Sequence, residues 1–432
     1  MMNQDQSSNA QLPPEILSYI FSLAIPKQYP LQKIAPEVTL SHVSSYWRAV
    51  AVTTPSFWTK IVVFSRRSKP RLNAYLQRSG TRNVDITIDI YRYEQRRFVS
   101  KKRWDKKKIA FVESVADIIV SNMDRIRSLA FLCFSKTNLH RMVIPLYECH
   151  APNLQRLEVK YDSPEAFFSH MMTVPQRICI FKGGAPNMRY LSSDIPSMRP
   201  YVNLFHNIIS LDLNFPPLVG ARNLSFERFM DIIKVPANLR FLTVRGCVDI
   251  NAWAFIQHAT QLELPHLQGL RLLDSGLMAA KFFLSISAPK IESLWMDCSI
   301  DEWDGLQHFL SASPTLPGFS TLKYLTMPNH ELTSIDTRLL NALTFSWAFV
   351  DTIILSMLKE QNESLVLSLR TLVALRDGQG RPTFRILVNE DQFTKIRRAF
   401  RGFPPGVVEV LLFNSTTYTE IWWSKQDQLE LS

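Results

Sequence analysis

Cysteine and histidine residues gather once in this sequence in a way that could bind a metal, at Cys133, His140, Cys149 and His150. Thiolate and imidazole are ordinary Zn²⁺ ligands, but structural zinc sites pair them at short, regular spacings. The spacing here matches no common site, and the adjacent Cys149 and His150 cannot easily converge on one ion. We therefore expect ordinary buried side chains and predict no metal.

Signatures of catalysis are equally sparse. The sequence contains no G-x-S-x-G, P-loop, G-x-G-x-x-G or H-E-x-x-H motif. The stretch "DGQGRP" at 377–382 has the composition of a turn, and its glycines do not form a phosphate-binding loop. Several acidic residues are scattered with no paired base, namely Asp231, Asp297, Asp301, Glu302 and Asp304. We therefore predict a noncatalytic protein that needs no cofactor.

One short segment carries most of the positive charge. Residues 91–108 read "YRYEQRRFVSKKRWDKKK", with nine Lys or Arg against two acids, in a chain of formal net charge +11. A local excess of this kind favours a solvated basic loop, 91–108, over a broad nucleic-acid-binding face. The interleaved Tyr91, Tyr93, Phe98 and Trp104 leave open an RNA contact, an acidic partner or a nuclear import signal.

Cysteine usage and hydropathy constrain the cellular setting. The five cysteines are an odd number, widely separated and without a C-x-x-C pair, so a reducing compartment is expected. The first ten residues lack the positive region of a signal peptide, and no apolar run reaches 18 residues. We predict a cytoplasmic or nuclear protein without a membrane span.

Two short helices are predicted near the start of the chain. The first covers 13–24, where proline suits the first turn and Glu15 lies near the positive end of the helix dipole. About three turns are not stable alone in water, so this apolar helix needs a packing partner. The second covers "TLSHVSSYWRAVAVTTP", with Thr39 or Ser41 as its N-cap and Pro55 as its stop.

The remainder of the chain shows an internal repeat of the form apolar-x-x-Leu-x-apolar. The pattern occurs eight times, and the separations between its leucines average 28 residues, near the upper end of the leucine-rich-repeat range. Similar stretches at 84–90, 349–357, 383–389 and 407–414 are candidates for further strands. The shared leucines are Leu129, Leu157, Leu191, Leu211, Leu242, Leu270, Leu294 and Leu325.

This repeat predicts a stack of strands. Side chains alternate along a strand, so the leucine and the residue two positions later point to the same side. The segment 225–236 has helical spacing and would return the chain to the next strand. One unit buries too little surface alone, so the units must stack. We predict an α/β fold, a small all-α domain of about three helices followed by a leucine-rich-repeat solenoid.

The N-terminal region resembles the F-box. The resemblance rests on "LPPEIL" at 12–17, "VSSYWRAVA" at 43–51 and "PSFW" at 55–58, and it is similar in form to F-box proteins of mushroom-forming fungi. The predicted organisation is a disordered tail (1–10), an F-box (11–64) and a connecting helix or linker (65–83). A leucine-rich-repeat-like solenoid (84–425) and a short tail (426–432) follow.

The resemblance implies a role in ubiquitin ligation. A family member docks on a Skp-type adaptor of a cullin–RING (SCF-type) ubiquitin ligase and holds a protein substrate elsewhere. The residues implied to bind the adaptor or form the core beneath it are Leu12, Pro13, Ile16, Leu17, Ile20, Val43, Trp47 and Trp58.

The substrate would lie on the strand residues that flank the inward leucines. These residues are Arg156, Glu158, Lys160, Phe241, Thr243, Arg245, Arg271, Trp295, Asp297, Tyr324 and Thr326. Trp295 is the foremost anchor candidate, because it is a large aromatic residue at a predicted outward position.

Two other functions stay open. An F-box protein can act outside ubiquitination, and a repeat scaffold could bind nucleic acid or acidic partners through 91–108.

Overall fold

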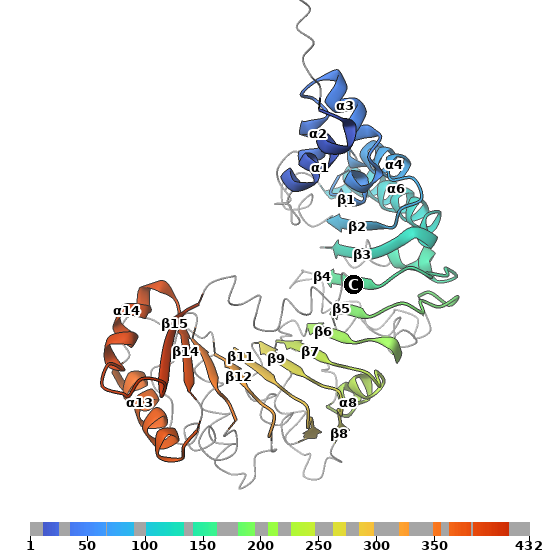
Figure 1. The fold of residues 1–432 in the computed structure, drawn as a ribbon. Coiled ribbons are helices and arrows are strands. Elements are labelled where there is room, and N and C mark those ends of the chain that lie inside the picture. Colours follow the sequence, from blue (N-terminus) through green and yellow to red (C-terminus); the bar gives the residue numbers. More distant parts are fainter. Residues whose placement is uncertain are drawn as a thin grey trace, which may run out of the picture. The chain divides into compact units, whose positions relative to one another are not determined.

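The computed structural model divides the chain into two compact units, residues 1–162 with 180–186, and residues 163–179 with 187–432 (Figure 1). It describes residues 12–25, 35–65, 67–89, 101–133, 141–161, 180–194, 206–214, 226–246, 262–273, 285–297, 319–327, 349–355, 363–381 and 383–413. No helix among these residues is long and apolar enough to cross a membrane.

Unit 1 begins with three α-helices, α1 (Pro14–Ala24), α2 (Pro36–Leu40) and α3 (Ser45–Val52), and a 3₁₀ turn, η1 (Pro55–Trp58). The predicted second helix is therefore two helices. Ser44 has an extended backbone and accepts a hydrogen bond from the backbone N–H of Trp47 (3.1 Å), so Ser44 is the N-cap of α3. Ser41, one of the two predicted N-caps, instead lies at the C-terminal end of α2.

The helices enclose a small aromatic core. The ring of Phe21, on α1, lies 4.8 Å from the ring of Trp47 and 6.1 Å from that of Phe57. Trp58 is fully buried, and its Nε1 donates a 2.8 Å hydrogen bond to the carbonyl oxygen of Ala51. The indole therefore buries its ring without leaving its polar atom unsatisfied.

A parallel sheet completes unit 1, with strands in chain order: β1 (Lys60–Val63), β2 (Val84–Asp89), β3 (Ile126–Cys133) and β4 (Arg156–Tyr161). The connection from β1 to β2 is α4 (Ser68–Arg78), and that from β2 to β3 contains α6 (Lys101–Val120) followed by η2 (Met123–Arg125). A further 3₁₀ turn, η3 (Ile144–Leu146), precedes β4. Ile61, Ile86, Leu129 and Leu157 are register partners across the four strands, and all are buried.

The structure corrects the prediction for the basic segment. Residues 101–108 form the first turns of α6 and not a loop, while 90–100 lie outside the described residues. The physical reason is that lysine and arginine are good helix formers. Apolar residues at helical spacing follow them, and these anchor the second half of the helix: Phe111, Val112, Val115, Ala116 and Ile119 are buried.

Unit 2 contains a second series of parallel strands in chain order. These are β5 (Tyr190–Asp194), β6 (Ser210–Asn214), β7 (Phe241–Arg245), β9 (Gly269–Leu273), β11 (Ser293–Asp297), β12 (Tyr324–Thr326), β13 (Thr352–Leu355), β14 (Phe384–Val388) and β15 (Val408–Leu412). Two short strands, β8 (Leu262–Glu263) and β10 (Ile286–Ser287), pair separately. The described helices are α8 (Phe226–Lys234), α13 (Glu363–Gly378) and α14 (Glu390–Ala399).

The repeated leucines of unit 2 form one continuous row through the sheet. Leu191, Leu211, Leu242, Leu270, Leu294 and Leu325 are successive register partners and are fully buried. Ile353, Ile386 and Val410 extend the same row through β13, β14 and β15. Each leucine is thus packed against the equivalent residue of the neighbouring strand, because parallel strands in register place equivalent positions side by side.

Candidate protein-interaction site

Helix α1 has one buried side and one exposed apolar side. Leu17 and Phe21 point into unit 1 and are 2% and 0% exposed. The exposed apolar residues of this region, 41–69% exposed, are Leu12, Ile16, Tyr19, Ile20 and Leu23. Single exposed apolar residues are ordinary, but several on one short helix indicate an interaction surface. We call these five residues the α1 face.

The start of the α1 face is held in place by backbone contacts. The hydroxyl of Tyr46, on α3, donates a 2.5 Å hydrogen bond to the carbonyl oxygen of Leu12. The carbonyl oxygen of Pro13 accepts a 3.0 Å bond from the N–H of Leu17, which starts the helix. Leu12 and Pro13 therefore present exposed side chains from a fixed backbone.

Two other predicted contact residues lie on α3 or just before it. Val43 is exposed in the turn between α2 and α3. Trp47 is partly exposed, and the rest of its ring packs on Phe21. Both positions leave apolar surface open to a partner.

Leu17 and Trp58 are not open to a partner in this structure. Leu17 faces inward because it lies one residue, about 100° of helix rotation, from the exposed Ile16. Trp58 is covered by Tyr75, whose ring meets it edge-on at 4.9 Å, and by the guanidinium of Arg78 at 4.4 Å. The structure thus places these two predicted adaptor contacts in the core.

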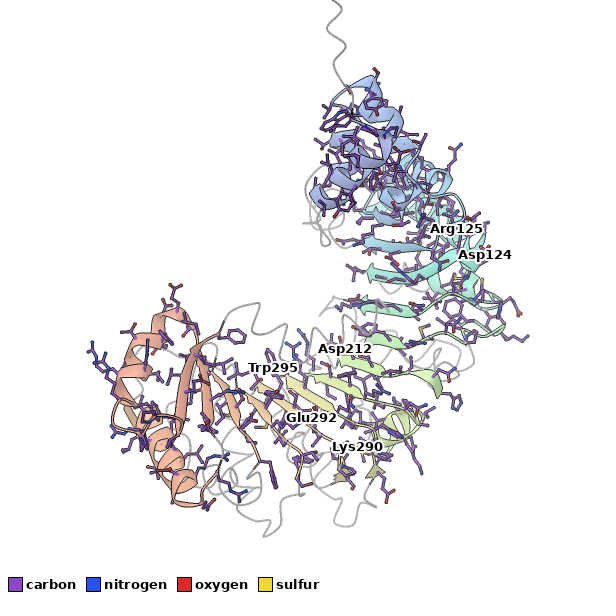
Figure 2. The ribbon with its side chains drawn as sticks, viewed as in Figure 1. Asp124, Arg125, Asp212, Lys290, Glu292 and Trp295 are labelled. Carbon is purple, nitrogen blue, oxygen red and sulfur yellow. The ribbon has the colours of Figure 1, made fainter. Side chains whose placement is uncertain are left out.

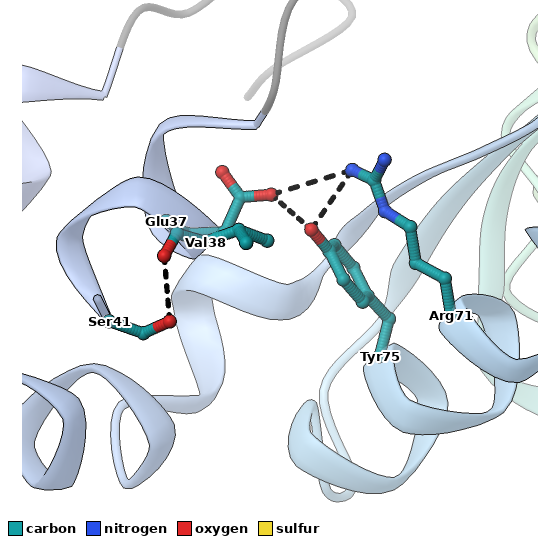
Figure 3. Close-up of polar contacts among 5 residues, drawn as sticks. All are labelled: Glu37, Val38, Ser41, Arg71 and Tyr75. Carbon is teal, nitrogen blue, oxygen red and sulfur yellow. Dashed lines mark hydrogen bonds and ion pairs between the residues drawn. The ribbon is translucent and has the colours of Figure 1, made fainter.

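A buried polar cluster joins α2 to α4 (Figure 3). The Tyr75 hydroxyl donates a 2.6 Å hydrogen bond to Oε1 of Glu37 and accepts a 3.0 Å bond from Nη2 of Arg71. The same Arg71 nitrogen lies 3.9 Å from Glu37 Oε1. Burial, together with the hydrogen bond to Glu37, raises the pKa of the Tyr75 phenol above its ordinary value. Glu37 is almost completely buried, so these partners compensate for its lost hydration.

The sequence analysis missed the cluster of Glu37, Arg71 and Tyr75. Its only signal is a carboxylate in the first turn of a short helix after Pro36, which also suits an exposed helix start. Which partner it meets depends on residues 34 to 38 positions away in the chain. Ser41 supports the same region, because its hydroxyl donates to the Val38 carbonyl oxygen at 2.7 Å.

The predicted substrate residues of unit 1 form an ion-pair group on β4. Glu158 lies 3.6 Å from Nη2 of Arg156 and also pairs with the ammonium group of Lys160. On the neighbouring strands, Arg127 binds the Asp85 carboxylate with two hydrogen bonds of 3.0 and 2.7 Å. Arg156 and Lys160 remain partly open to solvent, whereas Glu158 is largely covered.

The predicted substrate residues of unit 2 separate into buried and open ones. Phe241 and Trp295 (the latter labelled in Figure 2) are only 3% and 8% exposed. The Arg271 guanidinium stacks 4.2 Å from the Trp295 ring centre. Trp295 is therefore a packed residue and not the outward anchor that alternation predicted. Thr243 and Thr326 are also buried.

The open members of the predicted substrate set in unit 2 are polar or amphipathic. Arg245 is exposed, and Arg271 and Tyr324 are partly exposed. The backbone of Asp297 ends β11, but its side chain lies outside the described residues. The structure thus leaves Arg245, Arg271 and Tyr324 as the accessible members of the predicted set in unit 2.

Cys149 and His150 make local contacts. The Cys149 thiol lies 3.5 Å from the Pro145 carbonyl oxygen, and burial raises its pKa. His150 Nδ1 lies 2.5 Å from the carbonyl oxygen of Gly183. Within the part of the chain that the structure describes, no three His, Cys, Asp or Glu are grouped to hold a metal ion. The side chains of Cys133 and His140 fall outside that part.

Comparison with protein families identifies the N-terminal region. Residues 9–63 match the family described as F-box-like. No match was found among curated proteins. The N-terminal helices therefore form an F-box-like domain, which confirms that part of the prediction and supports an F-box protein. The α1 face belongs to this domain.

Proposed function

We propose that this protein is the noncatalytic substrate-recognition subunit of an SCF-type ubiquitin ligase. Its F-box-like domain binds a Skp-type adaptor, and its strand region holds a protein substrate. The mechanism is tethering. A substrate that is held near a conjugating enzyme loaded with ubiquitin meets that ubiquitin at a high effective concentration. The observation that carries the proposal is the exposed α1 face within an F-box-like domain. Such ligases act in the cytoplasm and nucleus.

The adaptor contact would use the open residues of the domain. Burial of apolar surface is worth about 25 cal/mol per Å², so several half-exposed side chains on a fixed backbone can supply much of a binding energy. The hydrogen bond from Tyr46 fixes the Leu12 backbone before binding and reduces the entropy lost on association. The proposed contact residues are Leu12, Pro13, Ile16, Ile20, Val43 and the open edge of Trp47, joined by Tyr19 and Leu23.

The region after the F-box-like domain is, on this proposal, a leucine-rich-repeat-type solenoid. Two features support this: parallel strands in chain order, and buried leucines that are register partners of one another. The boundaries 11–64, 65–83 and 84–425 and the likeness to F-box proteins of mushroom-forming fungi belong to the same proposal.

The substrate contacts proposed from the strands are the accessible ones. In unit 1 they are Arg156 and Lys160, with Glu158 orienting both through ion pairs. In unit 2 they are Arg245, Arg271 and Tyr324. Trp295 supports Arg271 from below by stacking against its guanidinium.

Binding to a purified Skp-type adaptor tests the proposal. The full chain is expected to co-purify with the adaptor, and the double substitution Leu12→Ala, Pro13→Ala is expected to weaken binding at least tenfold. Leu375→Ala, at a leucine of α13 that is 46% exposed against 49% for Leu12, is the control and is expected to bind like the wild type. Retention of full affinity by the double variant would show that the α1 region is not the adaptor contact.

Proximity labelling in cells then addresses the substrate. The Leu12→Ala, Pro13→Ala variant keeps the strand region but should not deliver substrates for ubiquitination, so these should accumulate near it. Proteins enriched by this variant and lost with Arg245→Ala or Lys160→Ala are the expected substrates. Identical labelling by all variants would argue against the strand face as the substrate site.

A further inference from the structure

Strand β15 lies at the end of the sheet, and its side chains are much less covered than those of the strands before it. Among the described residues, β14 is the only strand that pairs with β15. Strand β13 is buried at every position, and β14 is buried at every position except Arg385. All the residues of β15 are partly or fully exposed, and Leu412 is 40% exposed. The last described strand therefore lacks the cover that the interior strands have.

The sequence of β15 does little to protect this edge. Natural edge strands are commonly protected by lysine, by proline or by a bulge. Strand β15 reads "VEVLL" and keeps an unbroken register with β14 over its whole length. Its one charged residue, Glu409, is paired with Arg385 of β14, with 3.3 Å between Nε and Oε2. An apolar edge of this kind favours pairing with a further strand.

Backbone hydrogen bonds show which groups of β15 point outward. The Val407 carbonyl oxygen accepts a 2.9 Å bond from the N–H of Phe384, and the N–H of Phe413 donates a 2.7 Å bond to the Val388 carbonyl oxygen. Every second residue of a strand bonds to the same neighbour, so the odd-numbered positions face β14. The residues that direct their N–H and C=O groups away from β14 are Val408, Val410 and Leu412.

These outward groups are complementary to those of an identical strand. A two-fold axis perpendicular to the sheet joins two copies of one edge as antiparallel strands. With the axis at Val410, this residue lies opposite its own equivalent, and Val408 lies opposite Leu412 of the second copy. Opposite residues whose backbone groups face each other exchange two hydrogen bonds in an antiparallel pair. The side chains brought together are valine and leucine, so the pairing also covers apolar surface.

Helix α14, which packs against β15 and lies beside it in Figure 1, carries opposite charges at its two ends. Its first turn contains Glu390 and Asp391, and its last turn contains Arg397 and Arg398. The same two-fold axis places the two α14 helices antiparallel on one side of the joined sheet. The acidic end of each helix then lies toward the basic end of the other. This charge complementarity favours a second copy of the chain over an unrelated strand.

We propose that β15 is a dimerisation edge, at which two copies of this protein join by antiparallel pairing of their β15 strands. The pairing of two short strands buries little surface, so the contact between the two α14 helices contributes to the interface. The dimer does not depend on the adaptor or substrate interactions proposed above. It carries two F-box-like domains, one from each copy.

Light scattering after size-exclusion chromatography tests the dimer, with the full chain studied over a series of dilutions. The wild type is expected to have the mass of two chains at micromolar concentration and to dissociate on dilution. Leu412→Lys places a charge in the paired edge and is expected to weaken dimerisation at least tenfold. Leu375→Lys, at a leucine of α13 that is 46% exposed, is the matched control and should dimerise like the wild type.

A second variant, Val408→Pro, tests the backbone pairing separately. Proline removes the outward N–H at this position but no bond to β14, and it is tolerated in the first position of an edge strand. Dimerisation is expected to weaken at least tenfold, with adaptor binding and circular dichroism unchanged. The stability of β15 variants is compared at dilutions where the chain is monomeric, so that lost pairing is distinguished from lost folding.

Two charge variants of α14 test the antiparallel arrangement. Glu390→Lys with Asp391→Lys gives a helix with two basic ends, and Arg397→Glu with Arg398→Glu gives a helix with two acidic ends. Each variant alone is expected to dimerise at least tenfold more weakly, because like charges meet across the two-fold axis. A mixture of the two variants is expected to restore the dimer as a heterodimer. Circular dichroism checks that α14 remains helical in both.

Three results would overturn the proposal. The first is a wild type that stays monomeric at micromolar concentration, and if hydrogen exchange then showed protected amides at 408, 410 and 412, another segment of the same chain would occupy the edge. The second is assembly beyond two chains, which a closed two-fold pairing does not allow. The third is an equal loss of dimerisation in Leu412→Lys and Leu375→Lys.

Discussion

The phenol hydroxyl of Tyr75, on α4, donates a 2.6 Å hydrogen bond to the carboxylate of Glu37, on α2. Helix α2 lies in the F-box-like domain, whereas α4 follows the first strand of unit 1. This bond and the adjacent Arg71 therefore fasten the F-box-like helices to the start of the sheet by a buried polar contact.

Removing the Tyr75 hydroxyl tests the importance of this contact. Tyr75→Phe is expected to lower the free energy of unfolding by about 1–3 kcal/mol, because the buried Glu37 carboxylate loses the hydrogen bond from the Tyr75 hydroxyl. Urea unfolding near pH 8 measures the change. Tyr46→Phe, which removes the more exposed bond to Leu12, should cost less. Equal stability of Tyr75→Phe and the wild type would contradict the assigned role.

The same pair predicts a pH dependence. The pKa of Tyr75 is raised in the folded protein above its ordinary value of about 10. The unfolded chain therefore releases this proton first as the pH rises, so the contribution of the neutral phenol is complete below about pH 10 and falls progressively as the pH rises further. The stability difference between wild type and Tyr75→Phe should shrink between about pH 9 and pH 11. A constant difference across this range would contradict the prediction.

Two neighbouring residues of α1 should affect different properties, Ile16 adaptor binding and Leu17 the stability of the fold. Ile16→Ala is expected to change the free energy of unfolding by no more than about 0.5 kcal/mol, since Ile16 is half exposed. It should weaken adaptor binding at least tenfold. Leu17→Ala should cost about 2–5 kcal/mol of stability, because it opens a cavity beside Phe21. Thermal unfolding and adaptor titration of both variants make the comparison, and a stability loss in Ile16→Ala would argue against the assigned faces.

The hydroxyl oxygen of Ser44 should contribute to stability as the N-cap of α3. Ser44→Ala is expected to cost about 1 kcal/mol, because the Trp47 N–H loses its acceptor, while Ser44→Asp should retain most of the stability. Ser22→Ala is the control, since its exposed hydroxyl only donates to the Tyr19 carbonyl oxygen within α1. Chemical denaturation distinguishes the three, and equal effects at both serines would remove the case for a cap.

A residue of the leucine row should contribute less to stability on β15, the last described strand, than on an interior strand. Leu270→Ala is expected to cost about 2–5 kcal/mol, because Leu270 is fully buried between two strands. Val410→Ala should cost clearly less, since Val410 keeps the same register position on β15 but is only partly buried. Urea unfolding of unit 2 measures both, and an equal cost would mean that β15 is as well covered as the interior strands.

A glycine near the end of unit 1 should tolerate no side chain. A Cβ at Gly183 would lie 2.9 Å from the Cβ and 3.0 Å from the Cα of His150, so Gly183→Ala must displace backbone. We expect a loss of about 1–3 kcal/mol. Gly378→Ala meets no atom within 4 Å at the end of α13 and should leave stability unchanged or raised. Thermal shift assays compare them, and a neutral Gly183→Ala would contradict the close packing.

The sequence by itself determined the buried row of the strands. Leu129, Leu242 and Leu294 were identified from a repeat, and each lies in a strand with its side chain buried. This works because alternation along a strand is a local property, and the same pattern in successive units places equivalent residues side by side. The motif at 12–17 likewise pointed to the F-box-like domain that the family comparison found.

Tertiary structure decided which side chains remained open. Trp295 alternates outward in the sequence but is covered in the fold. Leu17 is buried because it lies on the same side of α1 as Phe21, whereas Ile16 lies on the exposed side. The pairing of Glu37 with Tyr75 joins two segments that are 38 residues apart in the chain. Burial and pairing of this kind arise from contacts between distant residues, so local periodicity carries no record of them.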